Sequence, residues 1–201
     1  MKNSEWGAVA YLAQSVYGLN GKNIYINNVS LNNNKQSVYA VTGMGALSED
    51  AAQITTTINA INNGKLTNVY NWKQENGTKA STTGTVYGIY DMSGSNYERT
   101  TGLVANGNSK LINVGIALTN NGMAYTASTK YVTLYPSNNF EETEIDKGSK
   151  KNYEINTKIY GDGIRETSTT GIGNTSWYKD CSYFPQYYGQ LSVRGGWIFA
   201  R

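Results

Sequence analysis

Apolar side chains recur at three- and four-residue spacing near the start of the chain, which predicts a helix over residues 4–17 with one buried face. The members of this stripe are Trp6, Val9, Ala10, Ala13, Val16 and Tyr17. Asn3 or Ser4 can accept hydrogen bonds from the free amides of the first turn, and Glu5 suits the positive end of the helix. Gly18 is placed to end the helix in a left-handed conformation.

An alternating pattern follows and predicts a short strand. Ile24 and Ile26, with Val29 beyond them, are expected on one side of this strand. Tyr25 and Asn27 are expected on the other side, because side chains alternate along an extended chain.

A second apolar stripe, weaker than the first, predicts a helix over residues 48–62 with Ser48 as its cap. The stripe consists of Ala51, Ile54, Ile58 and Ile61. The threonine run 55–57 lowers the intrinsic stability of this helix, because β-branched side chains lose rotamer freedom there. Asn63 and Gly64 end it.

The rest of the pattern indicates short strands and turns. The strand candidates are Val86–Tyr90, Leu111–Leu118, Lys130–Leu134 and Leu191–Phe199, with Asn-Gly turns at 106–107 and 121–122. A dense charge run over 141–151 is typical of a solvated loop or short helix; a hard-cation site is the alternative, but the run lacks EF-hand spacing. Without an internal repeat or a low-complexity linker, residues 1–201 are interpreted as a single domain.

Composition agrees with an α+β class rich in strands and turns. Charged residues make up only 15% of the chain, and there are 22 glycines, 17 tyrosines and 2 prolines. A net charge of +3 without a basic cluster does not indicate nucleic-acid binding.

The inventory of reactive side chains is short. The chain has no histidine, which excludes a Ser-His-Asp triad and histidine-bound zinc. The single cysteine, Cys181, cannot form an internal disulfide, and a small buried apolar role is favoured over a reactive thiol. No apolar run reaches the roughly 18 residues of a membrane-spanning helix, and the polar residues after Lys2 do not form a signal peptide.

Residues 84–99 read Gly-Thr-Val-Tyr-Gly-Ile-Tyr-Asp-Met-Ser-Gly-Ser-Asn-Tyr-Glu-Arg. This string resembles the G-[IVL]-Y-D-M-x-G-N-V-W-E-W signature of the formylglycine-generating-enzyme (sulfatase-modifying factor) family, which has a C-type-lectin-like fold. Two further segments match the family in the same order. Residues 3–11 resemble its T-E-A-E-W-E-Y-A-A helix, and residues 193–197 resemble its R-G-G-S-W strand.

The resemblance implies that a set of residues maintains the scaffold: Trp6, Gly88, Asp91, Gly94, Gly195 and Gly196. Glycine permits unusual backbone conformations and close approach, whereas Asp91 and Ser93 suit local bonds to the backbone. In the family, an asparagine and a glutamate of the central string bind calcium. Here Ser95 replaces the asparagine and Glu98 is kept, which leaves Glu98 as a weak calcium candidate; no other metal or cofactor is expected.

The departures from the family decide the functional expectation. Catalysis in the family depends on two copper-binding cysteines, and this chain has only Cys181. We therefore expect no enzyme of that type, with a divergent sulfatase-modifying enzyme or another carboxylate-based enzyme as the alternative. Residues 1–12 and 81–94 also resemble uncharacterised surface proteins of gut Firmicutes. Some of these have a pilin-like or membrane-anchored N-terminus, and related domains are the variable binders of diversity-generating retroelements.

The favoured function is an adhesion or ligand-binding module at the cell surface or outside the cell. Its partner would be a glycan or protein on another cell or host surface, and its membrane attachment would come through a part missing from this chain. A phage receptor-binding protein on the same scaffold is the alternative. Aromatic side chains supply rigid contact area, and the proposed contact residues are Trp177, Tyr178, Tyr183, Tyr187, Tyr188, Arg194 and Trp197. Trp177 and Trp197 are expected to be buried, and the four tyrosines exposed. The family's extra strands at both ends imply a chain trimmed at both ends.

Overall fold

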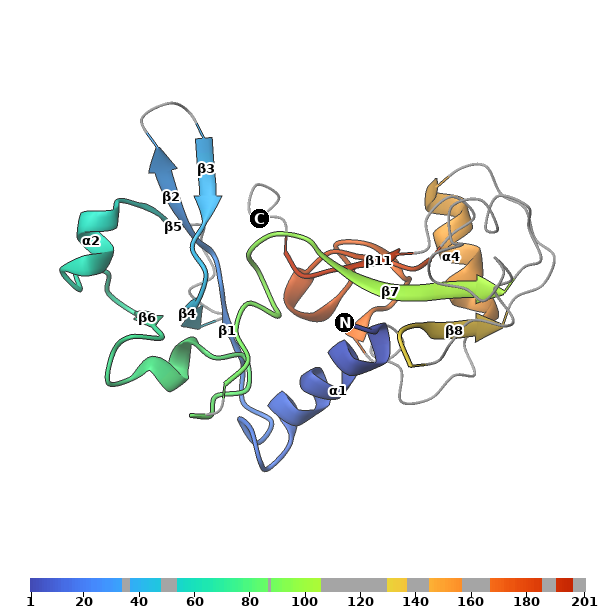
Figure 1. Cartoon of the computed structure of the whole chain (residues 1–201), viewed down its shortest axis with the longest axis horizontal. Helices are drawn as coiled ribbons and strands as arrows, with labels where there is room; N and C mark the ends of the chain where they lie inside the picture. Colours follow the sequence, from blue (N-terminus) through green and yellow to red (C-terminus); the bar gives the residue numbers. More distant parts are fainter. Residues whose placement is uncertain are drawn as a thin grey trace. The chain divides into compact units, whose positions relative to one another are not determined.

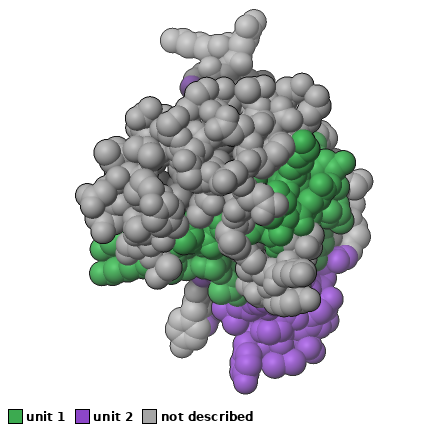
Figure 2. Space-filling view, turned by 90° about the vertical axis from the view of Figure 1, so that its right-hand side faces the viewer, with its two compact units in different colours: residues 1–8, 98–194 green, residues 9–97, 195–201 purple. Residues whose placement is uncertain are grey.

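The computed structural model describes residues 1–33, 37–47, 54–86, 88–105, 130–136, 145–156, 167–185 and 191–196. Helices and small sheets are mixed along the chain, as the predicted α+β class requires (Figure 1). The chain forms two compact units, coloured separately in Figure 2. Unit 1 comprises Met1–Ala8 and Glu98–Arg194, and unit 2 comprises Val9–Tyr97 and Gly195–Arg201. The interpretation of residues 1–201 as one domain stays a prediction.

The predicted first helix is confirmed as α1, Asn3–Gln14. Trp6, Ala10 and Ala13 of the stripe are buried, whereas Val16 and Tyr17 lie beyond the helix and are exposed. The helix ends before the predicted Tyr17, in a series of turns whose left-handed residues are Asn20 and Gly21. Gly18 does not have a positive φ; it allows close packing instead, because a Cβ there would overlap the Leu12 carbonyl oxygen.

Unit 1 contains a five-stranded sheet in the order β8-β7-β11-β10-β9. Its strands are β7 (Glu98–Ala105), β8 (Thr133–Pro136), β9 (Ile172–Gly173), β10 (Ser182–Tyr183) and β11 (Leu191–Arg194). The β7–β8 pair is parallel and the other pairs are antiparallel. The strand predictions for 130–134 and 191–199 are therefore confirmed in part, since β8 lies slightly later and β11 ends at Arg194.

Aromatic rings form a core in unit 1. Phe184 lies 4.6 Å from Tyr135 and 6.0 Å from Tyr153, measured between ring centroids, and all three rings are buried. Tyr153 comes from α4 (Ile145–Ile155), which includes part of the charge run over 141–151. Of the two structures predicted for this run, a loop or a short helix, the described residues form the helix. Gly171 has φ +67°, and its missing Cβ leaves room for the Tyr153 ring.

Unit 2 contains two three-stranded sheets, in the orders β1-β4-β6 and β3-β2-β5. The elements are β1 (Tyr25–Ile26), β2 (Val29–Asn33), β3 (Ser37–Ala40), β4 (Met44–Leu47), β5 (Ile54–Thr56), α2 (Ile58–Asn62), β6 (Val69–Asn71) and the short 3₁₀-helix η2 (Gly77–Ala80). Its apolar core joins both sheets, because Val29 of β2 packs with Met44, Ala46 and Val69.

Two sequence predictions fail in unit 2. Residues 54–56 of the predicted 48–62 helix form strand β5, which pairs in parallel with β2. The β-branched run favours an extended chain, so within the described residues 54–62 only α2 is helical. Its cap is the Thr57 hydroxyl, which accepts from the Ala60 amide at 3.3 Å. Residues 48–53 of the predicted helix, with the predicted cap Ser48 and the stripe residue Ala51, lie outside the described residues.

The predicted strand 86–90 is also wrong for its described residues, which form no ladder. The segment instead closes a tight loop, in which the Thr82 amide donates to the Ile89 carbonyl at 2.8 Å. Gly88 permits this closure, because a Cβ there would overlap the Ser81 hydroxyl. The predicted strand 111–118 and both predicted Asn-Gly turns lie outside the described residues.

Candidate functional site

The corner after this loop, residues 91–95, contains three residues with left-handed backbone. Asp91 has φ 63°, Gly94 has φ 79° and Ser95 has φ 59°. The Asp91 carboxylate accepts from the Asn27 amide nitrogen Nδ2 at 2.6 Å and from the backbone amide of Gly43 at 3.0 Å. The expected bonds to the local backbone are therefore replaced by long-range ones, and the carboxylate joins three separate segments of unit 2.

Burial raises the pKa of Asp91 above its ordinary value, and the hydrogen bonds from Asn27 and Gly43 oppose that rise. The Ser93 hydroxyl, expected to pin the corner, is buried without a hydrogen-bond partner among the described residues. The Ser93 backbone carbonyl instead accepts from the Asn27 backbone amide at 3.1 Å. The corner is thus held mainly through Asp91 and the backbone, which gives it a structural role.

In unit 1, the proposed ligand contact Arg194 is completely buried. Its guanidinium donates to Asn3 Oδ1 at 3.0 Å and to the Thr167 hydroxyl at 3.1 Å, and it lies 4.4 Å from the centre of the Trp6 ring. A further contact to the Ser176 hydroxyl measures 3.4 Å. These contacts are all internal, so they give Arg194 a role in stability; a ligand contact stays a prediction.

Three of the other proposed contact residues are described. Trp177 meets Trp6 edge to face at 6.0 Å, and Tyr178 lies 5.2 Å from Trp177. Trp177, Tyr178 and Tyr183 are all half-buried, so Trp177 is more exposed than expected and the two tyrosines less exposed. Tyr187, Tyr188 and Trp197 lie outside the described residues.

Tyr178 has a further distinction, because its backbone is left-handed, with φ 52° and ψ 37°. A tyrosine gains nothing locally from this conformation, and such residues gather at functional sites. This observation keeps Tyr178 a candidate contact residue. Cys181, close by in sequence, is buried as expected for a small apolar residue.

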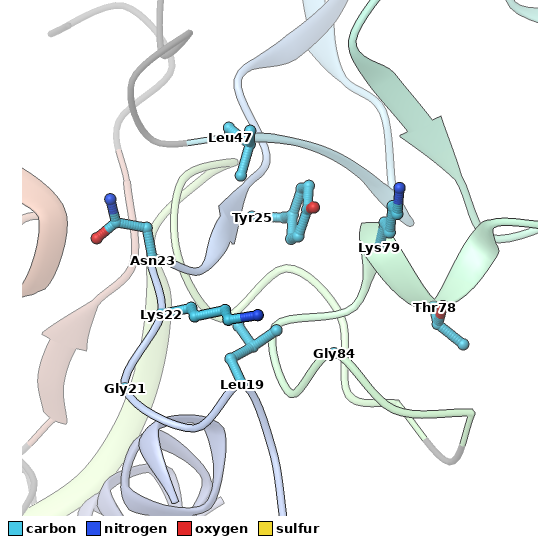
Figure 3. A pocket seen from close by; sticks show the side chains of 9 residues that line it. All are labelled: Leu19, Gly21, Lys22, Asn23, Tyr25, Leu47, Thr78, Lys79 and Gly84. Atoms are coloured by element: carbon cyan, nitrogen blue, oxygen red, sulfur yellow. The ribbon is translucent and has the colours of Figure 1, made fainter. Parts of the chain in front are cut away.

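Unit 2 contains a cavity that the sequence did not predict, with a volume of about 670 Å³. This volume falls within the roughly 300–1,000 Å³ typical of small-ligand sites. The lining residues are Leu19, Gly21, Lys22, Asn23, Tyr25, Leu47, Thr78, Lys79 and Gly84. Figure 3 shows the Tyr25 ring in the middle of the group, with Leu47, Lys22 and Lys79 around it.

Local structure explains how these residues meet. The turns after α1 bring Lys22 to the cavity, and β1 pairs Tyr25 directly opposite Leu47 of β4. Lys79 comes from η2, which packs against β4 where Gly45 leaves space. The only indication of this site in the sequence was the alternating pattern, which predicted that Tyr25 lies on the side of its strand opposite the apolar residues.

The cavity combines an aromatic ring with positive charge. Tyr25 meets Tyr70 edge to face at 5.4 Å, and the Lys79 ammonium lies 4.9 Å from the centre of the Tyr70 ring. Lys22 and Lys79 are exposed, and in the described part of the chain neither has a carboxylate within salt-bridge distance. The described lining residues include no acidic side chain. The arrangement suits recognition of a polar ligand with one apolar face.

In the described ranges, no group of three His, Cys, Asp or Glu residues comes together, so no cluster of ligands there supports metal binding. Glu98 lies half-buried in β7, with its Cα paired to Arg194 in the sheet register. The helices of the described ranges are too short or too polar to cross a membrane.

Comparison with protein-family models, with curated proteins and with solved structures finds no match to this chain.

Proposed function

We propose that this chain is a non-catalytic binding module on a C-type-lectin-like scaffold, which recognises a glycan or a protein surface outside the cell. The observation that carries the proposal is the cavity of unit 2, where a tyrosine ring, two lysines and polar side chains converge on one space. Tyrosine offers a rigid apolar face with one polar group, which suits ligand recognition.

The scaffold part of the proposal is supported by contacts among the segments that resemble the formylglycine-generating-enzyme family. In unit 1, Trp6 of the first segment stacks on Arg194 of the third. In unit 2, Gly94 of the central signature accepts a hydrogen bond from the Gly196 amide at 2.7 Å. Motif residues that are far apart in sequence but meet in space are expected when a motif set specifies one fold.

The non-catalytic part is supported by the side-chain inventory of the whole sequence. Without histidine, and with one cysteine that is buried, the chain lacks the copper-binding cysteine pair of the family it resembles. The cavity residues bring together ammonium, phenol, amide and hydroxyl groups. Such groups suit hydrogen bonding and charge recognition better than acid–base catalysis near neutral pH.

A glycan-array and cell-binding screen with the full chain tests the proposal. We expect selective binding that Tyr25→Ala weakens at least tenfold, whereas Tyr39→Ala, an exposed tyrosine of β3 outside the cavity, leaves it unchanged. Tyr178→Ala tests the second candidate surface in the same screen. Absence of any selective glycan or protein binding by the folded chain would overturn the proposal.

A further inference from the structure

The charge of the cavity narrows the class of ligand. Lys22 and Lys79 both line it, their side chains are exposed, and none of the described lining residues carries a carboxylate. Among the described residues no acidic partner neutralises either ammonium. Within the described part of the chain, a ligand that brings a negative charge would therefore find two cations with no carboxylate competing for them.

One of the two cations contacts an aromatic ring. The Lys79 ammonium lies 4.9 Å from the Tyr70 ring centre, and Tyr70 in turn packs edge to face on Tyr25. A cation–π contact at an exposed site is weak, so it orients the lysine while leaving its three donors available to a ligand. The charge therefore lies beside the aromatic pair of Tyr70 and Tyr25, of which Tyr25 lines the cavity.

The remaining lining residues give the cavity neither the character of a purely apolar pocket nor that of a peptide groove. Tyr25, Leu19 and Leu47 supply a small apolar surface, and Asn23 and Thr78 supply amide and hydroxyl groups. This mixture matches a sugar ring, which has apolar C–H faces and hydroxyl groups around its edge.

An extended peptide fits less well. Peptides commonly add a strand to a free sheet edge, but the edge strand β1 has only two residues, Tyr25–Ile26. Immediately after it, Asn27 is already bonded to the 93–95 turn: its amide donates to the Ser93 carbonyl at 3.1 Å and its carbonyl accepts from Ser95 at 2.6 Å. Little free backbone remains there for a peptide to pair with.

We propose that the cavity of unit 2 binds an anionic saccharide, with Lys22 and Lys79 contacting its carboxylate or sulfate and Tyr25 contacting the sugar ring. This inference rests on the proposed binding function and deepens it by naming the ligand class. The negative charge of the ligand comes from either a sugar carboxylate or a sugar sulfate, and the experiment distinguishes these two sources.

The test is calorimetric titration of the full chain with sialyllactose, sulfated lactose and neutral lactose. We expect at least one anionic sugar to bind at least tenfold more tightly than lactose, and this preference to shrink as salt is raised. Exposed ion pairs each contribute up to about fivefold in affinity. The double variant Lys22→Gln/Lys79→Gln should therefore weaken anionic binding by about 5- to 30-fold.

The matched control is Lys65→Gln, an exposed lysine of the same unit that does not line the cavity. Equal affinity for neutral and anionic sugars, or unchanged binding in the double variant, would overturn the anionic inference while the binding function stands. Binding of an acidic peptide but of no sugar through the same lysines would also overturn it. Failure of both this titration and the array screen would overturn the inference and the proposed function together.

Discussion

Gly196 lies directly against the backbone of Gly94, and its amide donates to the Gly94 carbonyl at 2.7 Å. A Cβ on Gly196 would come within 2.6 Å of the Gly94 Cα, a separation that real side chains do not reach. Two glycines, one from the middle of the sequence and one from near its end, therefore make one close backbone contact in unit 2. This contact explains why a glycine stands at position 196, two residues after β11.

Replacing Gly94 with alanine should destabilise unit 2 strongly. The residue has φ 79°, and a Cβ would overlap the Asn27 carbonyl oxygen and approach the Ile26 side chain to 2.8 Å. A left-handed alanine costs about 1–2 kcal/mol and steric overpacking adds about 1–3 kcal/mol. Urea denaturation should show a loss of at least about 2 kcal/mol. Gly64→Ala is the control: its φ is +62°, but its Cβ would meet only the Gln74 amide at 3.9 Å. Equal losses in the two variants would contradict the close contact.

Arg194→Lys should cost at least about 2 kcal/mol of unfolding free energy, although the charge is kept. Lysine cannot donate from a planar fork to Asn3 and Thr167 at once, and it stacks less well on Trp6. Arg99→Lys, an exposed arginine on β7 of the same unit, should change stability by less than about 0.5 kcal/mol. If thermal and urea denaturation find both variants equally stable, Arg194 does not hold unit 1 together.

Asp91 should make the stability of unit 2 depend on pH. Burial raises its folded pKa above the unfolded value, against the opposing bonds from Asn27 and Gly43. A raised folded pKa contributes stability that is present below the unfolded pKa, about 3.9, and is lost as pH rises through the folded value. Asp91→Asn should remove this decrease when unfolding free energy is followed from acid towards neutral pH. Glu75→Gln, which removes an exposed carboxylate of the same unit, should retain it. An unchanged profile in Asp91→Asn would refute the assignment.

Sequence periodicity predicted the elements whose partners are local. The Trp6–Ala10–Ala13 stripe gave helix α1 because helical burial repeats within the element itself. Ile54–Thr56 was misread as helix, since its apolar spacing fits either structure and its pairing with β2 is not visible locally. Residues 86–90 were misread as a strand for the same reason: nothing in the string shows that Gly88 packs on Ser81.

The candidate sites were less predictable than the fold. Tyr25 could be assigned to the polar side of its strand, but Lys22 and Lys79 reach the cavity only through the turns after α1 and the 3₁₀-helix η2. Those segments have no periodic signal. Arg194 was proposed as a ligand contact, and its internal contacts with Asn3 and Trp6 depend on a tertiary arrangement that sequence spacing does not encode.

The left-handed backbone at Tyr178 leads to an unusual order of stability among its variants. At ordinary positions glycine is less stable than alanine by about 0.5–1 kcal/mol, because it loses more backbone freedom on folding. At φ 52° and ψ 37°, alanine keeps the steric strain of its Cβ, whereas glycine has none. Both variants lose the ring contact with Trp177, so that loss cancels in the comparison. Tyr178→Gly should therefore be more stable than Tyr178→Ala by about 1 kcal/mol in urea denaturation.

The matched comparison is at Tyr183, a half-buried tyrosine in strand β10 of the same unit. Its backbone is not among those with positive φ, so the ordinary order should hold there, with Tyr183→Ala more stable than Tyr183→Gly. The reversal at Tyr178 alone would show that strain is stored at this residue. If Tyr178→Gly relieves the strain but does not restore ligand binding, the ligand needs the tyrosine ring and the fold does not. The need for the ring would then be the reason that the strained conformation is tolerated. If alanine is the more stable variant at both positions, the left-handed conformation of Tyr178 is not maintained in solution.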